Sequence, residues 1–211
     1  MDNLSRNNNL INQAWDYIKM VISQFGDYQL GEKKNETNID VIKLQITKLY
    51  DDLNAVFLLI DNKYFIQAGN LGRSIDDTCI HLMESVFSVF EDKNKKNQDI
   101  KIINKWLVQG YKSTQNIARK HKININHYKS IRDTFNKFEH GNYEIVKYYP
   151  YQLDKTQEIE NEDFIKNICS WHKLIEFYIY SCVIACAYLD SSDNNVGMKI
   201  IEDFNSTFNI K

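Results

Sequence analysis

The residues best suited to chemistry lie within positions 130–144, where Arg132, Asn136 and His140 follow one another at intervals of four. Side chains four apart on a helix are neighbours, and each such step turns by only about 40° around the axis. The three residues therefore form one polar stripe on a predicted helix. Apolar residues of the same stretch recur at intervals of three and four and form a separate face, made of Tyr128, Ile131, Phe135 and Phe138.

An arginine beside a histidine, with no set of metal ligands, suits the cleavage of RNA. The guanidinium can hold the scissile phosphate, and an imidazole can move the proton of the 2′-hydroxyl group near neutral pH. Gly141 directly follows His140 and suits the left-handed conformation that ends a helix, which leaves the imidazole beside unpaired terminal carbonyls that favour its cationic form. Arg132 and His140 are therefore the predicted catalytic pair, and neither a metal nor a cofactor is expected.

The surroundings of this pair are basic and aromatic. Residues 93–149 contain 13 Lys or Arg and four Asp or Glu, a local charge of +9 in a chain whose net charge is −2. Such a segment favours a polyanion, or an acidic part of another subunit. The residues expected to bind RNA are Arg119, Lys120, His127, Lys129, Asp133, Asn136, Lys137 and Tyr143. The alternative is that the basic residues form a solvated turn and that Tyr143 and the tyrosines after it pack over the end of a helical bundle.

The composition predicts an all-α fold. Only one proline, Pro150, and seven glycines interrupt 211 residues that are 43% apolar, which favours long helices over a barrel or sandwich with many turns. Helices are expected near 4–25, 38–60, 65–89, 100–117, 128–140, 164–189 and 197–208, with an irregular segment near 143–160. They predict a single domain built as an antiparallel bundle of four to five long helices. Its core spans roughly 38–190, flanked by an N-terminal helix and loop in 1–37 and a short C-terminal helix in 191–211.

Apolar spacing also predicts which side chains are buried. The expected buried face of the first helix consists of Trp15, Ile18, Ile22 and Phe25. The second helix alternates spacings of three and four without a fault, through Ile39, Ile42, Ile46, Leu49, Leu53, Val56 and Ile60. Asn38 is the expected cap of that helix.

The cysteines and the strongest apolar run indicate a reduced, cytoplasmic protein. The four cysteines occupy apolar helical positions without a paired framework, and the N-terminus has no basic-then-apolar leader. Cys182 and Cys186 have no histidine or carboxylate nearby to complete a zinc set, so they are expected in the core. The run 177–189 is too short to span a bilayer and predicts a central helix.

Arginine is scarce in this chain, and each arginine therefore carries information. The 22 lysines against four arginines, with 24 asparagines, are typical of an AT-rich bacterial genome. Arg73 is followed at the third and fourth positions by Asp76 and Asp77. An intrahelical salt bridge is the preferred interpretation of Arg73, and a site residue is the alternative.

Long helices, with a short one that carries an arginine, a polar residue and then His-Gly, resemble the HEPN superfamily of bacterial toxins and defence proteins. The stretch Asn70-Leu-Gly-Arg73-Ser-Ile-Asp-Asp77 is similar to HEPN-like abortive-infection proteins. The resemblance implies a helical core that dimerises so that two motifs share a cleft. It also implies that Arg132 binds phosphate, that Asp133 is the polar second residue and that His140 transfers a proton.

Two other interpretations stay open. Arg132 can instead pair on the helix surface with Asp133 or Glu139, while His140 only caps carbonyls. Seven residues separate Arg132 from His140, a longer gap than is usual in the family, which favours a non-catalytic helical module that binds a protein partner or regulates a toxin. A nucleotide pocket is disfavoured, because the chain has no Gly-rich phosphate loop.

Overall fold

The computed structural model describes residues 2–25, 38–62, 64–90, 133, 136–137, 162–190 and 195–208. These residues contain five helices and no strand, so this part of the chain is all-α, as its composition predicts. The helices are α1 (Asp2–Ser23), α2 (Asn38–Asp61), α3 (Phe65–Phe90), α8 (Glu162–Leu189) and α9 (Val196–Phe208). Residues 133, 136 and 137 are also helical. The expected helix near 100–117 and the irregular segment near 143–160 lie outside the described residues.

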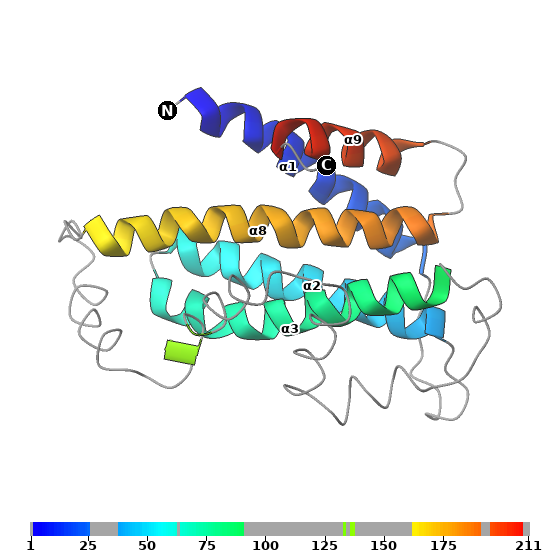
Figure 1. The fold of residues 1–211 in the computed structure, drawn as a ribbon, viewed down its shortest axis with the longest axis horizontal. Coiled ribbons are helices and arrows are strands. Elements are labelled where there is room, and N and C mark those ends of the chain that lie inside the picture. The colour runs from blue at the N-terminus through cyan, green and yellow to red at the C-terminus, as the bar shows by residue number, and fades with distance from the viewer. Residues whose placement is uncertain are drawn as a thin grey trace.

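A tight connection joins α2 and α3 into a helical hairpin. The side-chain amide of Asn62 donates to the carbonyl of Leu58 at 2.8 Å, and the backbone N–H of Tyr64 donates to the carbonyl of Leu59 at 2.7 Å. These bonds satisfy carbonyls that a helix end leaves unpaired, so the chain turns back at once. Figure 1 shows α8 lying along this hairpin, and α1 and α9 lie on the opposite side of α8.

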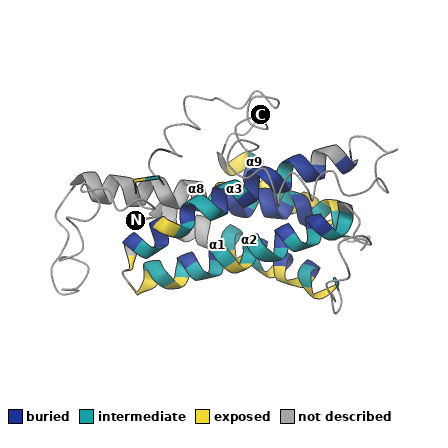
Figure 2. Ribbon diagram, turned by 90° about the horizontal axis from the view of Figure 1, so that it is seen from below, coloured by how far each residue is buried: buried dark blue, intermediate teal, exposed yellow. Residues whose placement is uncertain are grey.

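The apolar spacing of α2 and α3 is the reason that they pack together. On α2, the residues Ile42, Ile46, Leu49, Leu53 and Val56 are buried, and Ile39 and Ile60 at its two ends are partly buried. On α3, the buried apolar residues at helical spacing are Ala68, Ile75, Cys79, Leu82, Val86 and Val89. Figure 2 shows the buried positions gathered on α3 and α8 in the middle of the molecule. The seam predicted for α2 is confirmed.

The buried face of α1 differs from the predicted one. Ile18 is buried as expected, but Trp15, Ile22 and Phe25 are only partly buried, and Ala14, Tyr17 and Val21 are buried instead. The reason is that α1 packs mainly against α8 and α9. Trp15 lies on the side toward α2, where its ring stacks on Tyr50 at 4.7 Å between centroids and meets Phe57 edge-on at 5.5 Å.

The helix α8 is central, as its apolar run predicts. It contacts α1, α2, α3 and α9, and its buried residues Ile175, Tyr178, Ile179, Cys182 and Val183 join the same hydrophobic cluster as those of the other helices. No helix in the described ranges combines the length and the apolar character that crossing a membrane requires.

Candidate functional site

Three of the predicted site residues lie in the described part of the chain. Asp133, Asn136 and Lys137 are all helical; Asp133 and Lys137 are exposed, and Asn136 is partly buried. The remaining predicted site residues are outside the described ranges, and they are Arg119, Lys120, His127, Lys129, Arg132, His140 and Tyr143. The geometry of the site is therefore built around Asn136.

Asn136 is held by an arginine that lies 63 residues earlier in the chain. Nη1 of Arg73, on α3, donates a hydrogen bond to Oδ1 of Asn136. A guanidinium makes a stronger hydrogen bond than a neutral donor does, because it is charged. This bond connects the helical residue Asn136 to α3.

Arg73 has a second partner on its own helix. Its Nε lies 3.7 Å from Oδ2 of Asp77, and the two side chains are 19% and 28% exposed. Residues four apart on a helix are neighbours, which is why this ion pair was predictable from spacing alone. The contact with Asn136 was not predicted. The only signal for it was the arginine itself, one of four in a chain with 22 lysines.

A small polar network fixes the neighbouring turn of α3 to α2. Nζ of Lys48 donates to Oδ2 of Asp52 on the same helix and to Oγ of Ser74 on α3, the latter at 2.8 Å. Oγ of Ser74 in turn donates to Asp52 at 3.3 Å. Because Ser74 directly follows Arg73, this network holds the backbone that presents the guanidinium.

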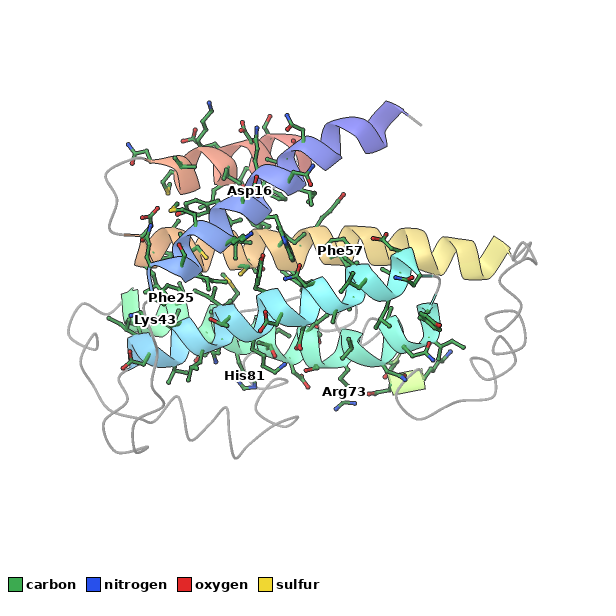
Figure 3. All side chains as sticks on the ribbon, turned by 180° about the vertical axis from the view of Figure 1, so that it is seen from behind. Asp16, Phe25, Lys43, Phe57, Arg73 and His81 are labelled. Atoms are coloured by element: carbon green, nitrogen blue, oxygen red, sulfur yellow. The ribbon has the colours of Figure 1, made fainter. Side chains whose placement is uncertain are left out.

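A stripe of ionisable side chains continues along α3 beyond Arg73. Asp77, His81 and Glu84 follow Arg73 at spacings of four, four and three, so the four residues share one side of the helix. Figure 3 shows Arg73 and His81 on the side of α3 that faces away from α8. His81 and Glu84 are nevertheless buried, with 5% and 7% of their surface exposed. Sequence reasoning missed His81, whose one signal was its helical register with Arg73.

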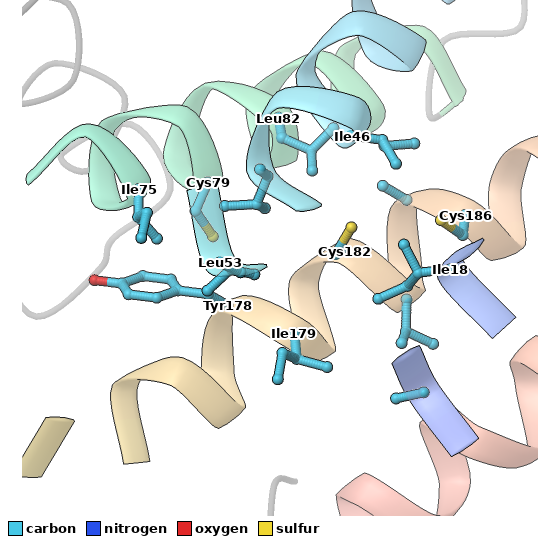
Figure 4. Close-up of a cluster of buried hydrophobic side chains, with 14 of the residues drawn as sticks. Ile18, Ile46, Leu53, Ile75, Cys79, Leu82, Tyr178, Ile179, Cys182 and Cys186 are labelled. Atoms are coloured by element: carbon cyan, nitrogen blue, oxygen red, sulfur yellow. The ribbon is translucent and has the colours of Figure 1, made fainter. Parts of the chain in front are cut away.

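The cysteines belong to the core. Cys79, Cys182 and Cys186 are buried and free of disulfides, and Figure 4 shows them among the apolar side chains where α3, α8 and α1 meet. Burial raises the pKa of Cys79 well above its ordinary value. A hydrogen bond with Cys186, together with burial, raises the pKa of Cys182. The thiols of Cys79 and Cys182 therefore stay protonated at neutral pH. The expectation that Cys182 and Cys186 lie in the core is confirmed.

No group of His, Cys, Asp and Glu side chains within the described ranges is arranged to hold a metal ion. Comparison of the chain with protein-family models, with curated protein sequences and with solved structures found no match. Function is therefore inferred from the residues themselves, above all from the contact of Arg73 with Asn136.

Proposed function

We propose that this chain binds RNA through its basic segment 93–149, and that Arg132 and His140 cleave the bound RNA without a metal. The supporting observation is the state of Asn136, the middle residue of the predicted stripe. Asn136 is helical and accepts a hydrogen bond from the charged guanidinium of Arg73 on α3, whereas Asp133 and Lys137 beside it are exposed. A helix that is fixed on one side and open on the other can present polar groups to a ligand.

The proposed chemistry needs two groups. The guanidinium of Arg132 binds the non-bridging oxygens of the scissile phosphate and stabilises the charge that develops on them. The imidazole of His140, in its neutral form, takes the proton of the 2′-hydroxyl group. The 2′-oxygen attacks phosphorus and forms a 2′,3′-cyclic phosphate, while the 5′-oxygen of the next nucleotide leaves and takes a proton from water. Exposed lysines such as Lys137 supply attraction to the backbone that does not depend on base sequence.

The wider setting follows from the HEPN resemblance and forms part of the proposal. The helices form an antiparallel bundle, two copies associate so that their sites share one cleft, and the protein acts in the bacterial cytoplasm as an effector of a toxin or phage-defence system. The local charge of +9 supports the shared cleft, because two such segments facing one cleft attract a polyanion more strongly than one does.

The test is cleavage and binding of labelled RNA by the purified full-length chain in the presence of a chelator. Arg132→Ala and His140→Ala should each lower the cleavage rate by about a hundredfold or more, the usual contribution of a positioned acid–base or charge-stabilising group. Only Arg132→Ala should also weaken RNA affinity. Lys19→Ala, at an exposed position of α1, is the matched control. Absence of cleavage by the wild type, with affinity unchanged in Arg132→Ala, rejects the proposal.

The second candidate is a non-catalytic module that binds a protein partner or regulates a toxin. The contacts that such a partner would cover are large apolar side chains that face solvent, among which Leu58 is 64% and Phe177 51% exposed. Exposed apolar side chains are typical of surfaces that bind other proteins when they form a patch. RNA binding that is lost in Arg132→Ala rejects this candidate. Stoichiometric binding of a protein that is lost in Phe177→Asp, with no RNA binding, supports it.

A further inference from the structure

We infer that Arg73 is a positioning residue of the RNA site. Its guanidinium holds Asn136 against α3 and thereby orients the helical residues 133, 136 and 137, and Asn136 is the anchor that it holds rather than a ligand of RNA. This inference rests on the proposed function for its consequence, but the anchor itself can be tested without RNA.

The first argument is that contacts other than the bond with Asn136 already hold Arg73 in place. Its Nε pairs with Asp77 at 3.7 Å, and its neighbour Ser74 is bonded to Lys48 of α2 at 2.8 Å. The guanidinium is therefore presented by a part of the fold that is fixed from two directions. A group supported in this way positions its partner more accurately than a side chain on a mobile stem does.

The second argument comes from exposure on the short helical stretch. On a helix, Asp133 and Lys137 are turned by about 60° and about 100° from Asn136, to one side of it. The structure exposes these two residues and partly buries Asn136. Exposure and the hydrogen bond therefore agree on one orientation, in which Asn136 faces α3.

The third argument concerns the predicted catalytic pair. Helical spacing predicts that Arg132 and His140 lie about 40° from Asn136, one turn before it and one turn after it. Rotation of the stretch about its axis would therefore move both groups together. On this prediction a hydrogen bond at Asn136 orients both groups, so loss of an anchor at the centre of the stripe should affect chemistry at its ends.

The fourth argument is the choice of arginine. The guanidinium offers separate N–H donors in a planar fork, so that Nε is directed at Asp77 while Nη1 donates to Asn136. A lysine ammonium at this position cannot reproduce the two directions. Arg73→Lys should therefore retain the charge but lose the orientation.

The first experiment measures amide hydrogen exchange over residues 129–140 of the full chain, without RNA. Arg73→Ala and Asn136→Leu should each raise exchange there by about tenfold, the double variant should be no worse than either one, and α8 should be unaffected. Asn136→Asp should keep the wild-type protection, because a carboxylate oxygen accepts the same bond. Unchanged exchange in Arg73→Ala, or additive effects, would overturn the inference.

The second experiment measures RNA affinity and the cleavage rate of the same variants, with Asn12→Asp on the exposed side of α1 as the control for added charge. Arg73→Ala and Asn136→Leu should lower the maximal cleavage rate by about tenfold and affect KM less, whereas Asn136→Asp should resemble wild type and Asn12→Asp. Loss in Asn136→Asp equal to that in Asn136→Leu would mean that Asn136 contacts RNA, and would overturn the inference. If the wild type neither binds nor cleaves RNA, the proposed function fails, and the exchange experiment still decides whether Arg73 is the anchor.

Discussion

The hydroxyl group of Tyr178 donates a hydrogen bond of 3.2 Å to Oδ1 of Asp76, and thereby joins α8 to α3 inside the molecule. Both side chains are buried. Asp76 lies three residues after Arg73, almost one turn along α3. The bond therefore ties the part of α3 that carries the candidate site to the central helix.

Tyr178→Phe tests how strongly this bond stabilises the fold. The substitution keeps the ring but removes a donor from a buried carboxylate, so the free energy of unfolding should fall by about 1–3 kcal/mol. Urea denaturation followed by circular dichroism measures it. Tyr180→Phe is the matched control, because Tyr180 is only partly buried and its hydroxyl donates at 2.7 Å to the neutral amide of Asn205. The control should lose less, about 0.5–1.5 kcal/mol. Equal losses of stability in the two variants would show that the bond to the buried carboxylate of Asp76 stabilises the fold no more than the bond to a neutral amide does.

How far the fold follows from sequence depends on what each helix contacts. Ile42, Ile46 and Leu49 were predictable because α2 packs along its whole length on α3, its neighbour in sequence, and a regular spacing is enough to define that face. The face of α1 was not predictable in the same way. It is set by α8 and α9, which lie far away in the sequence, and these helices bury Tyr17 while leaving Trp15 at the edge.

The same reasoning separates the two contacts of Arg73. The ion pair with Asp77 is local, and spacing by four residues is sufficient to predict it. The bond to Asn136 joins residues 63 positions apart, and no periodicity relates them. Sequence reasoning placed Asn136 on a helix, where it lies, but it could not show which group Asn136 faces.

Stability should fall at alkaline pH because of the buried thiols. The pKa values of Cys79 and Cys182 are raised in the folded protein, so these groups keep their protons while thiols of the unfolded chain ionise from about pH 8.5. Above that pH the folded state binds more protons than the unfolded state, and the free energy of unfolding decreases as pH rises. Below about pH 8.5 the contribution of these two thiols to the free energy of unfolding does not change with pH.

Urea denaturation between pH 7 and pH 9.5 checks this expectation. Each raised thiol contributes a slope of at most about 1.4 kcal/mol per pH unit in the alkaline range. Cys79→Ala should lower stability at every pH, because it opens a cavity, but should make the alkaline slope shallower. An unchanged slope in Cys79→Ala would show that Cys79 is not among the groups responsible.

If the basic segment binds RNA, affinity should depend steeply on salt. Each phosphate contact adds about 0.7 to the slope of log affinity against log salt concentration for a single strand. Lys129→Gln should therefore reduce that slope by about 0.7, as measured by fluorescence anisotropy with labelled RNA. Lys19→Gln, on the exposed side of α1, should leave the slope unchanged. Equal effects of the two substitutions would place the RNA elsewhere.

Gly197 is required by the close approach of α9 to Tyr17. A Cβ atom at this position would lie 2.7 Å from Cζ of Tyr17, would also overlap its Oη, and would lie 3.0 Å from Cβ of Ala187. Tyr17 cannot move aside without losing its 3.0 Å bond to Asp190. Gly197→Ala should therefore destabilise the protein by about 1–3 kcal/mol, measured by thermal unfolding. The cost should shrink in a Tyr17→Leu background, and an equal cost in both backgrounds would contradict this explanation.

Gln45 is a fully buried amide on α2, and neither its Nε2 nor its Oε1 has a hydrogen-bond partner within the described parts of the chain. An unsatisfied buried amide costs free energy that an apolar side chain of similar size does not. Gln45→Leu should therefore raise the free energy of unfolding by about 1–3 kcal/mol in urea denaturation. Gln13→Leu, at an exposed position of α1, is the control and should change stability by less than about 0.5 kcal/mol. A loss of stability in Gln45→Leu would instead mean that the amide is hydrogen-bonded in solution. Gln45 would then be a polar contact that helps to hold α2 in place beside α3.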